Sequence, residues 1–158
     1  MTAHFQAGIG ALIRRADTKE YLLLQRSAAK DVGAGHWECV TGRVDQGESF
    51  ETTLHREVRE ELGINVMIDF IVKTSHFYRG EPIVENELLS VIYACTIDNP
   101  DDIVTSSEHS KSRWTSAAEI YHFLDESHWL TLTVQRAEAI YAHMPSVLLD
   151  YFHEHGYE

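Results

Sequence analysis

Cysteines and long apolar runs are both scarce in this sequence. Its 2 cysteines, Cys39 and Cys95, each sit in an apolar stretch typical of a strand. This context favours buried reduced thiols over a disulfide or a metal site. The longest mostly apolar run, residues 88–97, is far short of the ~20 residues that span a bilayer. No basic-then-apolar signal peptide follows Met1. We therefore expect a cytoplasmic protein that does not enter a membrane.

Basic residues are also scarce. The chain has 13 Lys and Arg residues against 25 Asp and Glu residues, which gives a formal net charge of −12. A protein that wraps a nucleic-acid polymer needs a surface rich in Lys and Arg, so the composition disfavours this class of partner. An acidic protein can still act on a small phosphorylated molecule when cations screen the two from each other.

The length of the chain and its pattern of apolar and turn residues predict a single domain over residues 1–158, and this domain is of the α/β (α+β) class. A chain of 158 residues is ordinary for one domain, and neither repeats nor a low-complexity linker divide it. Hydrophobic periodicity and turn residues predict strands at 4–15, 20–27, within 30–42, at 64–80, 86–98 and 113–116, and helices at 48–63, 117–124 and 129–153, the last interrupted at Pro145. Strands and helices alternate without strict βαβ regularity. We therefore expect a mixed sheet between helices on both faces.

One predicted helix concentrates acidic side chains on one flank. Ser49 is placed as its N-cap and Gly63 as its C′ residue. Its core-facing stripe consists of Phe50, Leu54, Val58 and Leu62. Glu57, Glu60 and Glu61 project together beside this stripe.

These acids repel one another unless a cation binds between them. Glu57 faces Glu60 and Glu61 at i,i+3 and i,i+4, and each like-charge pair costs a few tenths of a kcal/mol. All three crowd the C-terminal half of the helix, where the helix dipole disfavours negative charge. Arg56 offsets part of this cost because it is well spaced to reach Glu60. A solvated charged face is the ordinary alternative, but the remaining cost favours bound Mg²⁺, which takes hard oxygen ligands and few carboxylates.

The spacing around this helix resembles the Nudix box. That pattern is Gly, five residues, Glu, seven residues, Arg-Glu, an aliphatic residue, any residue, Glu-Glu, any residue, Gly and an aliphatic residue. The chain matches every defined position, with Gly42, Glu48, Arg56, Glu57, Val58, Glu60, Glu61, Gly63 and Ile64. Chance agreement at the fixed residues is about 10⁻⁹ to 10⁻⁸ per register. The flanking order of strands and helices also fits the Nudix fold.

The resemblance implies a mechanism and a set of residue roles. Nudix hydrolases cleave a nucleoside diphosphate linked to another group, and they use Mg²⁺ or Mn²⁺. By resemblance, Glu57, Glu60 and Glu61 are metal ligands, and the carbonyl of Gly42 is a further oxygen ligand. Glu57 is also the candidate to deprotonate or orient the attacking water. Arg56 is expected to hold the acids in place by charge-assisted hydrogen bonds.

Many Nudix proteins also use an acid outside the box, on a later loop. Glu108 is the candidate here, both as a metal ligand and for catalysis, because it lies in a polar loop just before a short strand. Glu85 and Glu87 are the alternatives. They fall in a turn between two strands, where acids often serve solubility alone.

Two short stretches further resemble the dihydroneopterin triphosphate pyrophosphatases. One is residues 36–49, where Val-Thr-Gly replaces the Pro-Gly-Gly of many other branches, and the other is residues 107–120, with an acid-His pair ahead of a Trp. The expected reaction is therefore release of pyrophosphate from a nucleoside or pterin triphosphate. Candidate substrate contacts are Trp37 and Tyr78, which offer aromatic faces but equally suit core packing, and Arg26 and Arg43, whose charges suit phosphate, although Arg26 equally suits a solvated strand end.

Several alternatives stay open. The same mechanism could act on ADP-ribose, nucleotide sugars or dinucleoside polyphosphates, and a non-catalytic nucleotide-binding module could use the same scaffold. The last helical stretch either caps the domain or packs against a second copy of the chain in a homodimer.

Overall fold

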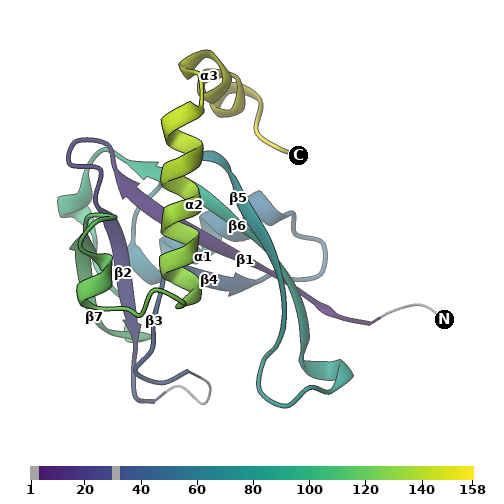
Figure 1. Cartoon of the computed structure of the whole chain (residues 1–158). Helices are drawn as coiled ribbons and strands as arrows, with labels where there is room; N and C mark the ends of the chain where they lie inside the picture. The colour runs from purple at the N-terminus through teal and green to yellow at the C-terminus, as the bar shows by residue number, and fades with distance from the viewer. Residues whose placement is uncertain (1–3, 30–32) are drawn as a thin grey trace.

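The computed structural model describes residues 4–29 and 33–158, and a seven-stranded mixed sheet forms its centre (Figure 1). The strands are β1 (Gln6–Arg15), β2 (Tyr21–Arg26), β3 (Trp37–Glu38), β4 (Val40–Arg43), β5 (Met67–Tyr78), β6 (Glu87–Ile97) and β7 (His109–Thr115). The helices are α1 (Phe50–Leu62), α2 (Trp129–His143) and α3 (Ser146–His155). The predicted fold class is confirmed.

The long strand β1 organises this sheet. The strands lie in the order β3-β2-β1-β6-β5, with β4 paired to β1 and β7 paired to β2. β1 runs parallel to β6 along its whole length, whereas its pairings with β2 and β4 are antiparallel. In the register of β4, Gly42 lies opposite Ile9. The glycine that opens the box pattern is therefore held on the central strand.

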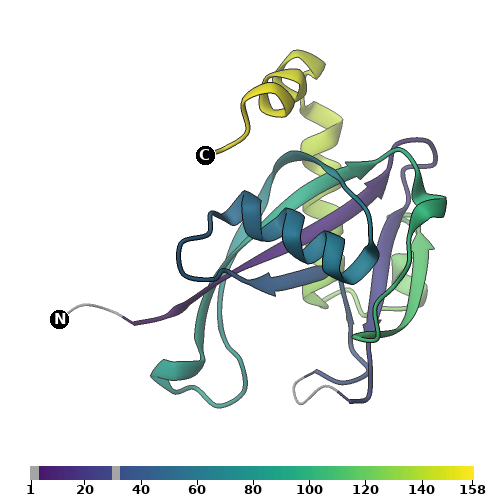
Figure 2. The ribbon, with the colours of Figure 1, turned by 180° about the vertical axis from the view of Figure 1, so that it is seen from behind.

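Helices cover both faces of the sheet, with α1 against one face and α2 against the other (Figures 1 and 2). Leu54, Val58 and Leu62 of α1 are fully buried in the core on its side. Leu130 and Val134 of α2 are fully buried in the second core. Each helix buries one apolar stripe against the sheet, as a layered domain requires.

The ends of α1 lie where the sequence predicts them. The side chain of Ser49 accepts a hydrogen bond from the backbone N–H of Thr52 at 3.2 Å and so caps the first turn. At the other end Gly63 has a φ of 70°, and its N–H donates to the carbonyl of Arg59 at 2.9 Å. Glycine adopts this left-handed conformation without a steric penalty, which ends the helix at Leu62.

Two elements differ from the predictions. β7 begins at His109 rather than at residue 113, because it pairs with β2 at the margin of the sheet. Residues 110–113 are polar and exposed there, so the sequence shows no period of two. The helix predicted at 117–124 is reduced to a 3-10 turn at Ile120–His122. So short a segment forms few helical hydrogen bonds, and burial of Ile120 anchors it instead.

The final helical stretch folds back on its own domain. Its predicted interruption at Pro145 separates α2 from α3, and α3 packs against β5. The carboxylate of Glu158 accepts hydrogen bonds from the backbone N–H groups of Phe50 and Glu51 at 3.0 and 3.3 Å. The stretch therefore caps the domain, and the homodimer stays a prediction. No helix within the described residues is long and apolar enough to cross a membrane.

Candidate active site

Arg56 is the centre of a hydrogen-bonded cluster beside β4. Its guanidinium donates to both carboxylate oxygens of Glu48, from Nε at 2.9 Å and from Nη2 at 2.8 Å. Nη1 donates to Oε1 of Glu57 at 2.8 Å, and Nη2 donates to the carbonyl of Arg43 at 3.1 Å. Two-pronged arginine–carboxylate pairs are strong and directional. Arg56 therefore fixes α1 to the loop that precedes it.

The two carboxylates that Arg56 binds have opposite pKa shifts. The hydrogen bonds from Arg56 and from a neighbouring threonine lower the pKa of Glu48 to about 2. Burial raises the pKa of Glu57, Arg56 works against this, and the charges of Glu60 and Glu108 add to the rise. Glu48 is thus a permanently ionised structural partner. The ionised form of Glu57, by contrast, calls for further positive charge nearby.

Gly42 lies directly against Glu57. A Cβ atom added to Gly42 would be 2.2 Å from both Cγ and Cδ of Glu57 and 2.3 Å from its Oε1. Side chains do not approach each other this closely, so only glycine allows the carboxylate to lie on the strand backbone. The structure therefore brings together two of the predicted site residues, one from β4 and one from α1.

The other two acids of α1 differ in exposure. Glu61 is only 5% exposed. The side chain of Glu60 is 61% exposed and lies 3.4 Å from Nη1 of Arg56. Both share the flank of Glu57 because they follow it by three and four positions. The three acids thus form a row from the protein interior to open solvent.

Glu108 lies near this row. It is close enough to Glu57 for its charge to raise the pKa of that residue. The preceding loop is tied to the last turn of α1, because the N–H of Ser106 donates to the carbonyl of Glu61 at 2.7 Å. The alternative acid Glu87 instead forms a 2.9 Å pair with a histidine of the β5–β6 hairpin. This geometry favours Glu108 as the distal acid.

Two buried side chains next to the acids are absent from the sequence predictions. Glu38 and His109 are each 8% exposed. Nη1 of Arg26 donates to Oε1 of Glu38 at 2.8 Å. Nε2 of His109 lies 3.3 Å from Oε1 of Glu38 and 3.7 Å from Oε2 of Glu61. Glu38 and His109 are 71 positions apart and belong to different strands, so no local pattern joins them.

The predicted substrate contacts lie at different places around the acids. Arg26 is half-buried at the end of β2, and Trp37 opens β3, partly buried against the core under α2. Arg43 is exposed at the end of β4, and Tyr78 is exposed at the end of β5. The ring of Tyr78 packs edge-to-face on that of His76, with centroids 5.6 Å apart. The β5–β6 hairpin projects from the same end of the molecule as the end of β2 and the start of β3 (Figures 1 and 2).

A known domain pattern covers most of the chain, since the NUDIX domain model matches residues 4–135. The chain belongs to the Nudix family. It is 31% identical over 110 residues to the mouse oxidized purine nucleoside triphosphate hydrolase. That alignment covers 66% of this chain and 66% of the mouse enzyme, so the chain matches about two thirds of its relative's length. The family predicted from the box is confirmed.

Two solved structures share the Nudix fold with this chain. The MutT protein from Methanosarcina mazei Go1 superposes with a TM-score of 0.72 at 25% identity, over 88% of this chain and 96% of that one. The dihydroneopterin triphosphate pyrophosphohydrolase of E. coli superposes with a TM-score of 0.65 at 22% identity, over 87% of this chain and 97% of that one. The second likeness concerns the fold alone. The family match and the hydrolase relative support a pyrophosphohydrolase enzyme.

The Nudix residues fit a divalent cation in their chemistry. Carboxylates and a backbone carbonyl are hard oxygen donors, and Glu57 packs directly on Gly42, the residue that carries the predicted carbonyl ligand. Within residues 4–29 and 33–158, no group of three His, Cys, Asp or Glu side chains is close enough in this conformation to bind a metal ion. Arg56 binds Oε1 of Glu57, and like charges repel one another. The acids must therefore turn toward one another when they bind a cation.

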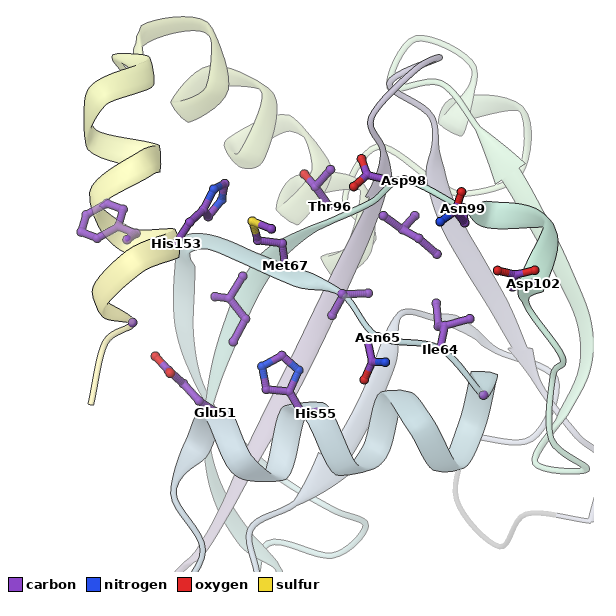
Figure 3. A pocket seen from close by; sticks show the side chains of 16 residues that line it. Glu51, His55, Ile64, Asn65, Met67, Thr96, Asp98, Asn99, Asp102 and His153 are labelled. Carbon is purple, nitrogen blue, oxygen red and sulfur yellow. The ribbon is translucent and has the colours of Figure 1, made fainter.

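A separate cleft lies on the other flank of α1. It has a volume of about 590 Å³ and is lined by Glu51 and His55 of α1, by the loop into β5, by the end of β6 and by α3 (Figure 3). Glu51 and His55 lie across the apolar stripe from Glu57, and none of the four glutamates of the Nudix box lines the cleft. We therefore assign the candidate active site from the chemistry of the acids and not from the size of this cleft.

Proposed function

We propose that this Nudix protein hydrolyses a diphosphate linkage in a nucleoside or pterin triphosphate and releases pyrophosphate, with Mg²⁺ or Mn²⁺ as cofactor. The observation that carries the proposal is the packing of Glu57 on Gly42, with Arg56 bound to Glu57, inside a complete Nudix box. The likeness to a mouse nucleoside triphosphate hydrolase supports the substrate class. A net charge of −12 agrees with a phosphorylated substrate only if cations screen it from the protein.

The proposed roles follow from the contacts of each acid. Glu57, Glu60, Glu61 and Glu108 hold the metal, together with the carbonyl of Gly42. A bound divalent cation supplies charge neutralisation and a more acidic water. Arg56 binds Oε1 of Glu57, so Oε2 is the oxygen that takes the proton from the attacking water. The water oxygen bonds to one phosphorus of the α–β anhydride, and the P–O bond between that phosphorus and the bridging oxygen breaks with its electron pair left on the departing group, so that the products are pyrophosphate and a monophosphate.

The proposal extends to substrate contacts and domain limits. Residues 1–158 form one Nudix hydrolase domain. Arg26 and Arg43 contact phosphates, and Trp37 and Tyr78 stack on the base or pterin. Arg26 suits this role because Glu38 already fixes its guanidinium.

The test is incubation of the purified protein with Mg²⁺ and a mixed panel of substrates, with every phosphorylated product identified. The panel contains nucleoside and pterin triphosphates, nucleotide sugars, ADP-ribose and dinucleoside polyphosphates. Pyrophosphate and a monophosphate from one triphosphate, formed only with Mg²⁺, are the expected products. Two phosphorylated fragments from a linked diphosphate would keep the mechanism and overturn the substrate. If a protein shown to bind Mn²⁺ turned over nothing, the non-catalytic nucleotide-binding module would be favoured instead.

A further inference from the structure

A buried polar cluster lies behind the acids of α1. It consists of Arg26 on β2, Glu38 on β3, His109 at the start of β7 and Glu61 on α1. The side chains of His109, Glu38 and Glu61 are 2%, 10% and 6% exposed. Charged groups are rarely buried to this degree unless each one has partners. The cluster is therefore not simply the solvated face of an edge strand.

His109 lies between two of the carboxylates. Its Nε2 is 3.3 Å from Oε1 of Glu38 and 3.7 Å from Oε2 of Glu61. Because carboxylates only accept hydrogen bonds, the nitrogen between them carries the proton. Nδ1 of His109 is buried and has no hydrogen-bond partner in the described part of the chain, which fits the tautomer with its proton on Nε2. The Nε2–H group thus donates to Glu38, and Oε2 of Glu61, a predicted metal ligand, lies just beyond hydrogen-bond distance of the same nitrogen.

The backbone holds His109 in this place from two sides. In the ladder of β2 and β7, His109 pairs with Arg26 at an irregular step in the register. The carbonyl of the preceding residue, Glu108, accepts a hydrogen bond from the N–H of Ser27 at 2.8 Å. The N–H of His109 donates to the carbonyl of Ser106, whose own N–H donates to the carbonyl of Glu61. The imidazole is therefore anchored both to the sheet and to the last turn of α1.

We propose that His109 is a positioning residue for Glu61: its Nε2–H, held in place by Glu38, stands 3.7 Å from Oε2 of Glu61 and becomes the hydrogen-bond donor to that oxygen when the carboxylate turns to meet a divalent cation. The inference rests on the proposed function, because it treats Glu61 as a metal ligand. Groups that hydrogen-bond to ligating carboxylates fix their direction, and losing one such group weakens metal affinity about 10- to 100-fold. Glu38 also binds Arg26, so one buried cluster orients both a metal ligand and a proposed phosphate contact.

The test compares two conservative variants of His109. In His109→Gln the amide nitrogen falls near the position of Nε2, whereas in His109→Asn the shorter side chain stops near the position of Nδ1. Both variants stay polar and of similar size. Mn²⁺ binding without substrate is measured from the electron paramagnetic resonance signal of free Mn²⁺, next to the Mg²⁺ concentration that gives half-maximal turnover. We expect His109→Asn to weaken Mn²⁺ affinity about 10- to 100-fold and His109→Gln to keep most of it.

The matched control removes another histidine–carboxylate contact. His153→Asn breaks the 2.7 Å pair of His153 with the buried Asp69, away from the acids of α1. We expect this control to lower the melting temperature and to leave Mn²⁺ affinity unchanged.

Three results would overturn the inference. If both His109 variants bound Mn²⁺ like the wild type, His109 would not position Glu61. Equal losses in His109→Asn and His109→Gln would assign His109 to packing, because position of the donor would not matter. A wild type that bound no Mn²⁺ and hydrolysed nothing would remove the proposed function, and the inference with it.

Discussion

Arg56 places two carboxylates of the same box in different electrostatic environments. Its two bonds to Glu48 make that acid a fixed anchor, whereas its single bond to Glu57 leaves the other oxygen of Glu57 for chemistry. The sequence spacing predicts this contact because Arg56 and Glu57 are neighbours on the chain. It does not predict that Glu48, eight positions earlier, takes two of the hydrogen bonds of Arg56. Those bonds depend on how the loop after β4 closes.

Gly42→Ala tests the close approach of β4 to α1. The new Cβ would lie 2.2 Å from Cγ of Glu57, so the carboxylate must move. Displacement of a catalytic group by about 1 Å lowers turnover about 10²-fold, and overpacking costs about 1–3 kcal/mol of stability. Steady-state rates and urea unfolding measure the two effects separately.

Gly10→Ala is the matched control on the neighbouring strand. Its Cβ would meet Cγ1 of Ile92 at 3.2 Å, within the core rather than at the acids. We expect a loss of stability with turnover retained. Equal turnover in the two alanine variants would contradict the role assigned to Gly42.

At the scale of elements, α1 is held at both ends by segments distant in sequence. Residues 104–106 bond to the carbonyls of its last turn, and Glu158 bonds to the first turn. Periodicity and capping residues predict the limits of α1, because they are local signals. They do not predict the partners at its ends, which lie about 40 positions away in the sequence at the last turn and more than 100 positions away at the first. For the same reason, the sequence does not predict the full length of β7 or the contact of Glu38 with His109. An exposed edge strand lacks the alternation of apolar and polar residues that would indicate it.

Glu158→Ala tests the cap on the first turn of α1. Partial burial opposes the charge of Glu158, but hydrogen bonds from Ser49 and from the N–H groups of Phe50 and Glu51 outweigh it and lower its pKa. A carboxylate whose pKa is lowered by folding stabilises the protein at neutral pH, and this contribution disappears as the pH falls through its folded-state pKa. We expect Glu158→Ala to lose about 0.5–1 kcal/mol at pH 7 and progressively less below pH about 4.5.

Chemical unfolding across this pH range measures the effect, with Glu154→Ala as control. The side chain of Glu154 is 77% exposed on α3 and contacts only a neighbouring histidine at 3.8 Å among the described residues. If Glu158→Ala lost as much unfolding free energy in acid as at pH 7, the charge of Glu158 would play no part in the cap.

At the scale of the whole molecule, acidic residues outnumber basic ones, so we expect bound divalent cations to stabilise the folded state. The net charge is −12, and α1 gathers three acids on one flank. A ligand that binds the folded state alone raises its stability by mass action, and each kcal/mol shifts the melting temperature of a domain this size by about 2–4 °C. We therefore expect MgCl₂ to raise the melting temperature more than NaCl of equal ionic strength.

A variant separates specific binding from general screening. In the double variant Glu60→Gln with Glu61→Gln, the extra shift from MgCl₂ over NaCl should vanish. An undiminished shift in that variant would place the stabilising cations elsewhere on the acidic surface.

The most direct test of the central claim compares two glutamate-to-glutamine variants of α1 on the substrate that the panel identifies. Glu57→Gln removes the proposed base beside Gly42, whereas Glu51→Gln makes the same change on the opposite flank, at the cleft of Figure 3. With Mg²⁺ present, we expect pyrophosphate release by Glu57→Gln to fall about 10²- to 10⁴-fold and that by Glu51→Gln to stay near the wild-type rate. Wild-type turnover by a folded Glu57→Gln variant would contradict the account.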